Sequence, residues 1–259
     1  MNGLGKKIAI VTGASGGLGK EFVKLLLREE NIDEIWAIAK NEEKLIRLQT
    51  DCGEKIKIFP TDLSNIKAIE DFSFYLKEHD PDILFLINNA GFAKFCSYND
   101  LSIEESVNMI DLNCSAVVAM GLVCIPYIKA GGHILNIASA AAFLPLPYQN
   151  IYSSTKAFVR NYSRALNIEL KEKAITVTAV CPGWINTPLL EKAQIGAPKA
   201  TRYFAGMVTA GKVAHKALKD AKKRKDMSIY GSFTKLFHIV SKLLPQSLLI
   251  KIWLRQQKL

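Results

Sequence analysis

The residues with the clearest chemical potential are a serine, a tyrosine and a lysine near the middle of the chain. Ser139 follows a short apolar run, and Tyr152 and Lys156 come 13 and 17 residues later. A tyrosine and a lysine four positions apart share one face of a helix. A nearby ammonium group stabilises a phenolate and lowers the pKa of tyrosine from its usual value near 10. Tyr152 could then act as general acid and base on an alcohol or carbonyl oxygen, with Ser139 donating a hydrogen bond to that oxygen.

A glycine-rich turn near the start of the chain could hold a cofactor. The segment Thr12–Gly19 reads TGASGGLG and lies between an apolar run and an amphipathic stretch. Glycines permit a tight turn and the close approach of a phosphate, and the start of the following helix attracts a pyrophosphate. Such a turn can also be a loop without a ligand, but its position favours a dinucleotide site. The predicted contacts from this turn are Gly13, Ser15, Gly16, Gly17, Leu18 and Gly19.

The residue after the second predicted strand indicates which dinucleotide binds. An acid at this position hydrogen-bonds the 2′-hydroxyl of the adenosine ribose in NAD-binding proteins. This chain has Lys40 there, and a lysine can pair with a 2′-phosphate. The sequence therefore favours NADP(H) over NAD(H), unless Lys40 is simply a solvated surface lysine. Asp62, followed by Leu63, comes after the third strand and could either accept from the adenine amino group or cap the next helix.

The chemistry requires a scaffold that brings these segments to one edge of a sheet. Short apolar runs at 8–11, 35–39, 56–59, 83–87, 133–137 and 175–180 alternate with helical patterns at 17–28, 42–48, 66–77, 103–127 and 152–170. Such alternation predicts an α/β fold with a doubly wound, mostly parallel, Rossmann-type sheet and helices on both faces. No linker or repeat interrupts residues 1–259, so we expect a single domain with a C-terminal helical extension.

In this order, the motifs resemble the short-chain dehydrogenase/reductase family up to about residue 232. The residues that carry the resemblance are Thr12-Gly13 with Gly17 and Gly19, Asp62, Asn88-Asn89-Ala90-Gly91, Asn113, Ser139, Tyr152, Lys156 and Pro182-Gly183. The resemblance implies that Asn113 holds a water linking Lys156 to solvent, that Lys156 binds the nicotinamide ribose, and that Thr187 binds the carboxamide. It implies further cofactor contacts from Asn89, Ala90, Gly91, Tyr152, Pro182, Gly183 and Ile185, a substrate lid at 185–207, and a homodimer or homotetramer.

The loops expected around the substrate are apolar. They contribute Phe92, Phe95, Phe143, Leu146, Tyr148, Trp184 and Tyr203. Such a pocket suits a bulky lipophilic carbonyl or alcohol, such as a hydroxysteroid or a long-chain 3-oxoacyl compound, although these residues could also pack against each other. The alternatives are a reductase of small xenobiotic carbonyls or polyols and, in a different class, a non-catalytic NADP(H)-binding scaffold at a membrane surface.

The net charge of +10 lies entirely in the C-terminal fifth of the chain. Within it, residues 233–257 form a basic amphipathic tail that could lie on an anionic membrane, cover the substrate mouth or pack on a partner subunit. Its lysines alternate with leucines and isoleucines, which argues against nucleic acid as a partner. Five scattered cysteines and four dispersed histidines indicate a cytoplasmic protein without a metal site, at most peripheral to a membrane. No apolar run is long enough for a membrane-spanning helix.

Overall fold

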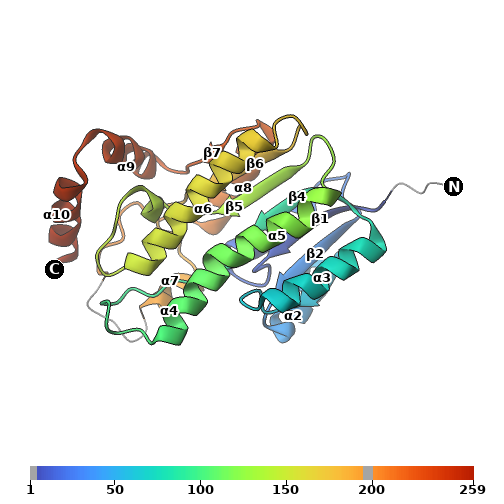
Figure 1. Ribbon diagram of the computed structural model, residues 1–259, viewed down its shortest axis with the longest axis horizontal. Helices are drawn as coiled ribbons and strands as arrows, with labels where there is room; N and C mark the ends of the chain where they lie inside the picture. The colour runs from blue at the N-terminus through green and yellow to red at the C-terminus, as the bar shows by residue number, and fades with distance from the viewer. Residues whose placement is uncertain (1–4, 195–200) are drawn as a thin grey trace.

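The computed structural model describes residues 5–194 and 201–259. Its centre is a parallel sheet of seven strands in the order β3-β2-β1-β4-β5-β6-β7 (Figure 1). The strands are β1 Lys7–Thr12, β2 Glu34–Ala39, β3 Ile56–Pro60, β4 Asp82–Asn88, β5 His133–Ile137, β6 Thr176–Val180 and β7 Met227–Ser228. The strand order reverses between β1 and β4, and ligands bind at such a switch point, beyond the carboxyl ends of the strands. The predicted fold class is confirmed.

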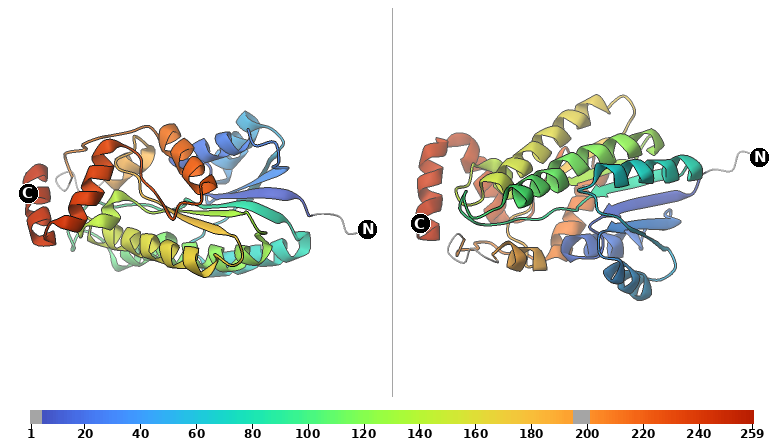
Figure 2. Two further views of the ribbon diagram at one scale, coloured as in Figure 1. Left: turned by 90° about the horizontal axis from the view of Figure 1, so that it is seen from above. Right: turned by 60° about the horizontal axis from the view of Figure 1, so that its bottom comes forward.

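Helices cover the two faces of the sheet in separate layers (Figure 2). One face packs against α1 (Gly17–Leu26), α2 (Glu42–Cys52) and α8 (Ala210–Lys222). The other packs against α3 (Ile66–His79), α5 (Ala116–Cys124) and α6 (Asn150–Glu169). Because both faces of the central strands are covered, their sequences are continuous apolar runs rather than alternating ones.

The sequence patterns missed two elements near the end of the sheet, α8 and the short strand β7. The buried face of α8 consists largely of small residues, Ala214, Ala217 and Ala221, among many lysines. Small side chains contribute little to an amphipathic pattern, so the sequence of this segment indicated its positive charge but not its helix. β7, which pairs with β6, has only two residues and is therefore too short to be predicted from a sequence pattern.

The long helix predicted at 103–127 exists, but its hydrogen bonding changes along its length. It comprises α4 (Ile103–Ile110), a π-helical segment η1 (Asp111–Ser115), α5 and a final 3₁₀ turn η2 (Ile125–Tyr127). Ile103–Tyr127 is also long and apolar enough to cross a membrane, which corrects the expectation that no segment would be. The longest apolar run of the sequence, 116–128, covers only the second half of this helix. Met120 and Cys124 of this helix are buried against the sheet, as in the core helix of a globular domain.

Two further helices form the C-terminal extension, α9 (Ser232–Leu243) and α10 (Gln246–Gln257), with Pro245 between them. They lie together at one end of the molecule, at the left in Figure 1. Leu249 of α10 is buried against Ala141, Leu144 and Leu146. The side chain of Gln257 is completely buried, and its Oε1 accepts hydrogen bonds from the backbone N–H groups of residues 202 and 203 at 2.7 and 3.0 Å. Helix α10 is therefore fixed to the domain near both of its ends.

Candidate active site

A cavity of about 900 Å³ opens at the carboxyl ends of the central strands. Its wall contains the glycine turn after β1, the loop after β4, the segment after β5, the start of α6 and the loop after β6. Segments far apart in the sequence thus meet at the edge of the sheet where the fold places ligands. Of the predicted cofactor contacts, the wall contains Gly13, Ser15, Gly16, Gly17, Leu18, Lys40, Asn89, Ala90, Gly91, Tyr152, Lys156, Pro182, Gly183, Ile185 and Thr187.

The glycine turn has the shape that a dinucleotide needs. Gly13 has a φ of +61°, and a Cβ there would lie 2.8 Å from Nδ2 of Asn89. A Cβ on Gly19 would lie 2.2 Å from the carbonyl oxygen of Gly13, so Gly19 packs beneath the turn rather than lining the cavity. A Cβ on Gly16 would meet nothing within 4 Å, which leaves space in front of the start of α1. The turn therefore fits a pyrophosphate, whose oxygens would accept hydrogen bonds from the free N–H groups at the start of that helix.

Thr12 connects the glycine turn to the loop after β4. Its Oγ1 accepts hydrogen bonds from the backbone N–H groups of Asn89 and Ala90, both at 2.9 Å. The side chain of Asn89 in turn donates to the carbonyl oxygens of Thr12 and Gly13 at 3.0 and 3.2 Å. These bonds hold the two cofactor-facing loops at a fixed separation.

Lys40 follows β2 in the cavity wall, and its side chain is 79% exposed. Its Nζ forms an ion pair with Oδ2 of Asp62 at 2.6 Å. Asn41 and Lys44, at the start of α2, line the same part of the cavity, and the Asn41 side chain caps α2 by accepting from the N–H of Lys44. Asp62 and Leu63 are not in the cavity wall: Asp62 accepts from Ser64 in the turn before α3, and Leu63 is buried in the core beneath.

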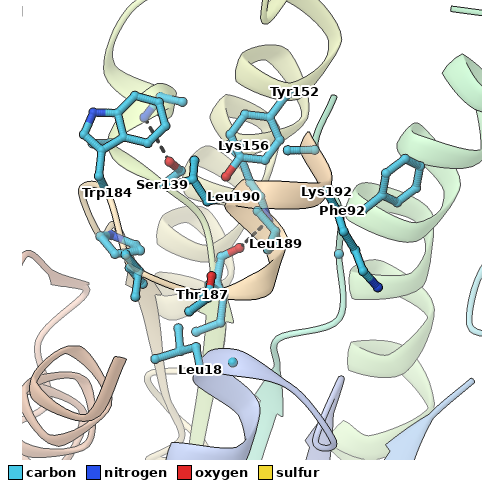
Figure 3. Close-up of a pocket in the computed structure, with 18 of the residues that line it drawn as sticks. Leu18, Phe92, Ser139, Tyr152, Lys156, Trp184, Thr187, Leu189, Leu190 and Lys192 are labelled. Atoms are coloured by element: carbon cyan, nitrogen blue, oxygen red, sulfur yellow. Dashed lines mark hydrogen bonds between the residues drawn. The ribbon is translucent and has the colours of Figure 1, made fainter. Parts of the chain in front are cut away.

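The structure brings Ser139, Tyr152 and Lys156 together in the wall (Figure 3). The Nζ of Lys156 donates to the carbonyl oxygen of Ile137, the last residue of β5, at 2.7 Å. It lies 5.8 Å from the centre of the Tyr152 ring. Because β5 ends beside the first turns of α6, strand and helix hold the serine, the phenol and the ammonium within one small region.

Burial sets the proton affinities of this group. It raises the pKa of Tyr152, and side-chain hydrogen bonding with Ser139 opposes the rise. Burial lowers the pKa of Lys156 to about 8. At neutral pH, Tyr152 therefore carries its proton, and Lys156 remains largely an ammonium close to its titration point.

Asn113 lies in the π-helical segment η1 and not in the cavity wall. Its Oδ1 accepts from the N–H of Phe92 at 3.0 Å, and its Nδ2 donates to the carbonyl oxygen of Phe92 at 3.0 Å and to Oγ1 of Thr155 at 3.1 Å. A Cβ on Gly91 would lie 2.7 Å from Oδ1 of Asn113 and 3.5 Å from Nζ of Lys156. The amide thus joins the loop after β4 to α6, next to the lysine.

Five of the seven predicted substrate residues are in the cavity wall. They are Phe92, Phe95, Leu146, Trp184 and Tyr203. Phe143 and Tyr148 are not. Phe143 is buried between α6 and α9, where its ring lies 4.3 Å from that of His238. Tyr148 adopts a positive φ of 64° in the turn before α6. Phe143 comes two residues after the wall residue Ala141, and Tyr148 directly precedes the wall residue Gln149, but neither of their side chains lines the cavity.

The C-terminal extension supplies wall residues that the family pattern did not suggest. They are Phe233, Thr234 and Phe237 of α9 and Trp253 and Gln256 of α10. The ring of Trp253 stacks on that of Trp184 with centroids 6.5 Å apart, and its Nε1 donates to the carbonyl oxygen of Pro147 at 3.4 Å. The amphipathic spacing of the tail was the only sequence signal for these contacts. It could not distinguish packing at the substrate mouth from packing on a membrane or on a partner subunit.

The predicted lid at 185–207 is described only in part, since residues 195–200 lie outside the described ranges. Ile185 forms a parallel bridge with Val208, which closes the base of the segment. α7 (Pro188–Ala193) follows Thr187, and its carbonyl at Ala193 accepts from the N–H of Phe95 at 2.8 Å. The first part of the segment therefore lies against the loop after β4.

Comparison with known proteins gives a consistent result. The family model described as short chain dehydrogenase matches residues 7–197. An uncharacterized oxidoreductase of Staphylococcus epidermidis is 29% identical over 196 residues, covering 75% of this chain and 84% of that protein.

Among solved structures, the closed form of serine dehydrogenase complexed with NADP⁺ is similar, with a TM-score of 0.75, 29% identity, and coverage of 86% of this chain and 94% of that one. A short-chain dehydrogenase/reductase from Burkholderia phymatum in complex with NAD has a TM-score of 0.77 at 20% identity, covering 94% and 96% of the two chains, and supports the fold alone.

Proposed function

Because the chain belongs to the short-chain dehydrogenase family, we propose that it is an NADP(H)-dependent oxidoreductase that interconverts a ketone and a secondary alcohol on a bulky lipophilic substrate. The observation that carries the proposal is the position of Ser139, Tyr152 and Lys156 in the wall of one cavity with the glycine turn. A bound nicotinamide cofactor supplies or accepts a hydride in this chemistry.

The side chains have separate tasks in the proposed reduction. Tyr152, protonated at neutral pH, donates its proton to the carbonyl oxygen, and Ser139 donates a hydrogen bond to the same oxygen as negative charge develops. Lys156 favours the phenolate that remains and contacts the nicotinamide ribose. Asn113 keeps the loop after β4 against α6 and holds a water that connects Lys156 to solvent. In the reverse direction the Tyr152 phenolate accepts the proton of the alcohol.

The preference for NADP(H) rests on the adenosine end of the cavity. Lys40 and Lys44 are both in the wall there, and the wall contains no aspartate or glutamate among the described residues. A 2′-phosphate can take the place that Asp62 occupies beside Lys40, whereas a ribose hydroxyl lacks the charge to compete for it. The similar serine dehydrogenase also carries NADP⁺ in its solved structure.

The proposed substrate class rests on the apolar wall. Phe92, Phe95 and Trp184 line it, and α9 and α10 extend it outward with further aromatic side chains. The cavity of about 900 Å³ also has to hold the dinucleotide, so the substrate class is inferred from the aromatic wall, which offers a polyol or a small polar carbonyl few hydrogen-bond partners. A hydroxysteroid or long-chain 3-oxoacyl compound matches it better. A purely scaffolding role would leave the Ser139, Tyr152 and Lys156 cluster without a purpose.

Exposed apolar side chains on the C-terminal extension and on the long helices suggest a membrane contact and a subunit contact, respectively. On the extension, Leu236 and Leu243 are 60% and 75% exposed beside Lys235 and Lys242, which suits an anionic bilayer surface near the substrate mouth. On the opposite layer, Leu122 of α5 and Phe158 of α6 are exposed, which suits a homo-oligomer formed through these helices.

The decisive experiment follows NADPH absorbance with the purified protein and a panel of steroid ketones, 3-oxoacyl compounds and small aldehydes. We expect turnover of bulky ketones, with NADPH preferred to NADH. Absence of turnover throughout the panel, together with absence of NADPH binding, would refute the proposal.

A further inference from the structure

The charged side chains that line the cavity all have the same sign. Among the described residues they are Lys40, Lys44, Lys94, Lys156 and Lys192, with no aspartate or glutamate. The proposed function uses three of them: Lys40 and Lys44 at the adenosine end, and Lys156 beside Tyr152. Lys94 and Lys192 have no part in that chemistry.

The two unused lysines come from segments that lie side by side. Lys94 belongs to the loop after β4 and Lys192 to α7. The N–H of Phe95 donates to the carbonyl oxygen of Ala193 at 2.8 Å, so each lysine directly precedes one partner of a single backbone hydrogen bond. Figure 3 shows both Lys192, on α7, and Phe92, on the loop after β4, among the side chains that line the cavity. The two ammonium groups therefore belong to one stretch of the cavity wall.

Neither lysine has an acidic ion-pair partner among the described residues. The ion pairs formed within residues 5–194 and 201–259 include neither Lys94 nor Lys192. Like charges on neighbouring segments repel each other, and apolar walls strengthen electrostatic interactions inside a cavity. An anion bound between the two ammonium groups would remove this repulsion and form charge-assisted hydrogen bonds.

We propose that the substrate is a lipophilic ketone or alcohol that carries an anionic group, a carboxylate or a phosphate, and that Lys94 and Lys192 bind this group. The inference rests on the proposed function and refines its substrate class. Phe92, Phe95 and Trp184 contact the apolar part of such a molecule while Tyr152 and Ser139 face its oxygen. The two lysines are specificity residues that orient the substrate and take no part in proton transfer.

The cofactor pyrophosphate is the other anion that could use these lysines. The start of α1 already provides N–H groups for a pyrophosphate, whereas Lys94 and Lys192 lie on the loop after β4 and on α7. The affinity for NADP⁺ in lysine variants therefore distinguishes the two ligands directly.

The test uses binding, because it does not depend on knowing the natural substrate. Dodecanoate, dodecyl phosphate and methyl dodecanoate, below their micelle concentrations, are titrated into the full-length protein saturated with NADP⁺ and followed by calorimetry. Wild type is compared with Lys94→Gln/Lys192→Gln. The charge-matched control is Lys171→Gln/Lys173→Gln, which changes two exposed lysines outside the cavity.

In wild type and in the control, we expect one of the anions to bind at least about 10-fold more tightly than the ester, as two charged hydrogen bonds allow. The tighter of the two identifies carboxylate or phosphate as the head group. In the double variant this advantage should fall below about 2-fold, with ester and NADP⁺ affinities unchanged.

Equal binding of anions and ester by wild type overturns the inference. So does a double variant that weakens the ester as much as the anions, or one that loses NADP⁺ affinity while retaining the anion preference. Failure of wild type to bind NADP⁺ at all would instead refute the proposed function.

Discussion

Thr234 of the C-terminal extension contacts Gly183 in the loop after β6, closely enough that a Cβ on Gly183 would lie 2.5 Å from Oγ1 of Thr234. Gly183 is one residue before Trp184, and both line the cavity. Helix α9 therefore packs directly on a segment of the cavity wall.

This contact predicts a specific pair of mutants. Gly183→Ala forces the methyl group against Thr234 and should lower the free energy of unfolding by about 1–3 kcal/mol, the usual cost of overpacking. Gly183→Ala/Thr234→Ala removes the opposing oxygen and should recover most of that loss. Urea denaturation of both variants checks the prediction. Equal stability of the single and double mutants would show that the extension does not constrain Gly183.

Gln257 should stabilise the molecule although it lies near the end of the chain. Gln257→Leu leaves the backbone N–H groups of residues 202 and 203 without their acceptor and should cost about 1–3 kcal/mol. The matched control is Lys258→Ala, an exposed neighbour, which should change the free energy of unfolding little. Thermal denaturation compares them, and an unchanged Tm for Gln257→Leu would contradict the assigned contacts.

Tyr152→Phe removes the proposed proton donor without removing the ring. We expect kcat to fall by about 10²- to 10⁴-fold, the range of general acid catalysis, while NADPH still binds. Steady-state kinetics and a fluorescence titration with NADPH measure the two effects. A variant that keeps more than a tenth of wild-type kcat would exclude Tyr152 as the acid.

Lys40→Asp should reverse the cofactor preference. Wild type is expected to favour NADPH, and the new carboxylate repels a 2′-phosphate and can accept from a 2′-hydroxyl. The ratio of kcat/KM for NADPH to that for NADH should fall by about 10-fold or more. Because Lys40→Asp also leaves Asp62 without its partner, Asp62→Asn is the control and should leave the preference for NADPH intact.

The lowered pKa of Lys156 predicts how reduction depends on pH. The ammonium form predominates below about pH 8 and is lost as the pH rises through that value. Tyr152 keeps its proton in the same range because burial raises its pKa. The kcat/KM for NADPH, measured at saturating ketone, should therefore decrease above about pH 8. A rate that rises through this range would contradict the proposed state of Lys156.

The sequence predicted most of the sheet, and the meeting of Ser139, Tyr152 and Lys156 in one cavity wall, because both depend on local signals. β5 was predicted with its observed bounds, since Gly131 and Gly132 precede it and Ser139 follows it. The strand alternation required that Ser139, Tyr152 and Lys156 reach the same edge as the glycine turn.

Features that depend on tertiary contacts could not be predicted in this way. The ion pair of Lys40 with Asp62 joins residues from different strand ends. Phe143 has the same apolar character as Phe92, and its packing against α6 and α9 places it outside the cavity. The surface against which the C-terminal tail packs could not be predicted either. Amphipathic spacing indicates that one face of a helix is covered, but it does not identify the membrane, subunit or cavity that covers it.

The π-helical turn at Asp111–Ser115 makes the direction of the Asn113 side chain depend on the number of residues in the helix. A π turn arises from one extra residue in an α-helix. Removing one residue from this turn would restore regular α-helix and leave α4 and α5 close to their present alignment, because the wide turn accommodates the extra residue, but it would redirect the side chains inside the turn. The amide of Asn113 would then no longer reach Phe92 and Thr155, although every remaining side chain would be unchanged. In this helix, the length of the chain between Ile110 and Ala116 matters as much as the identity of its residues.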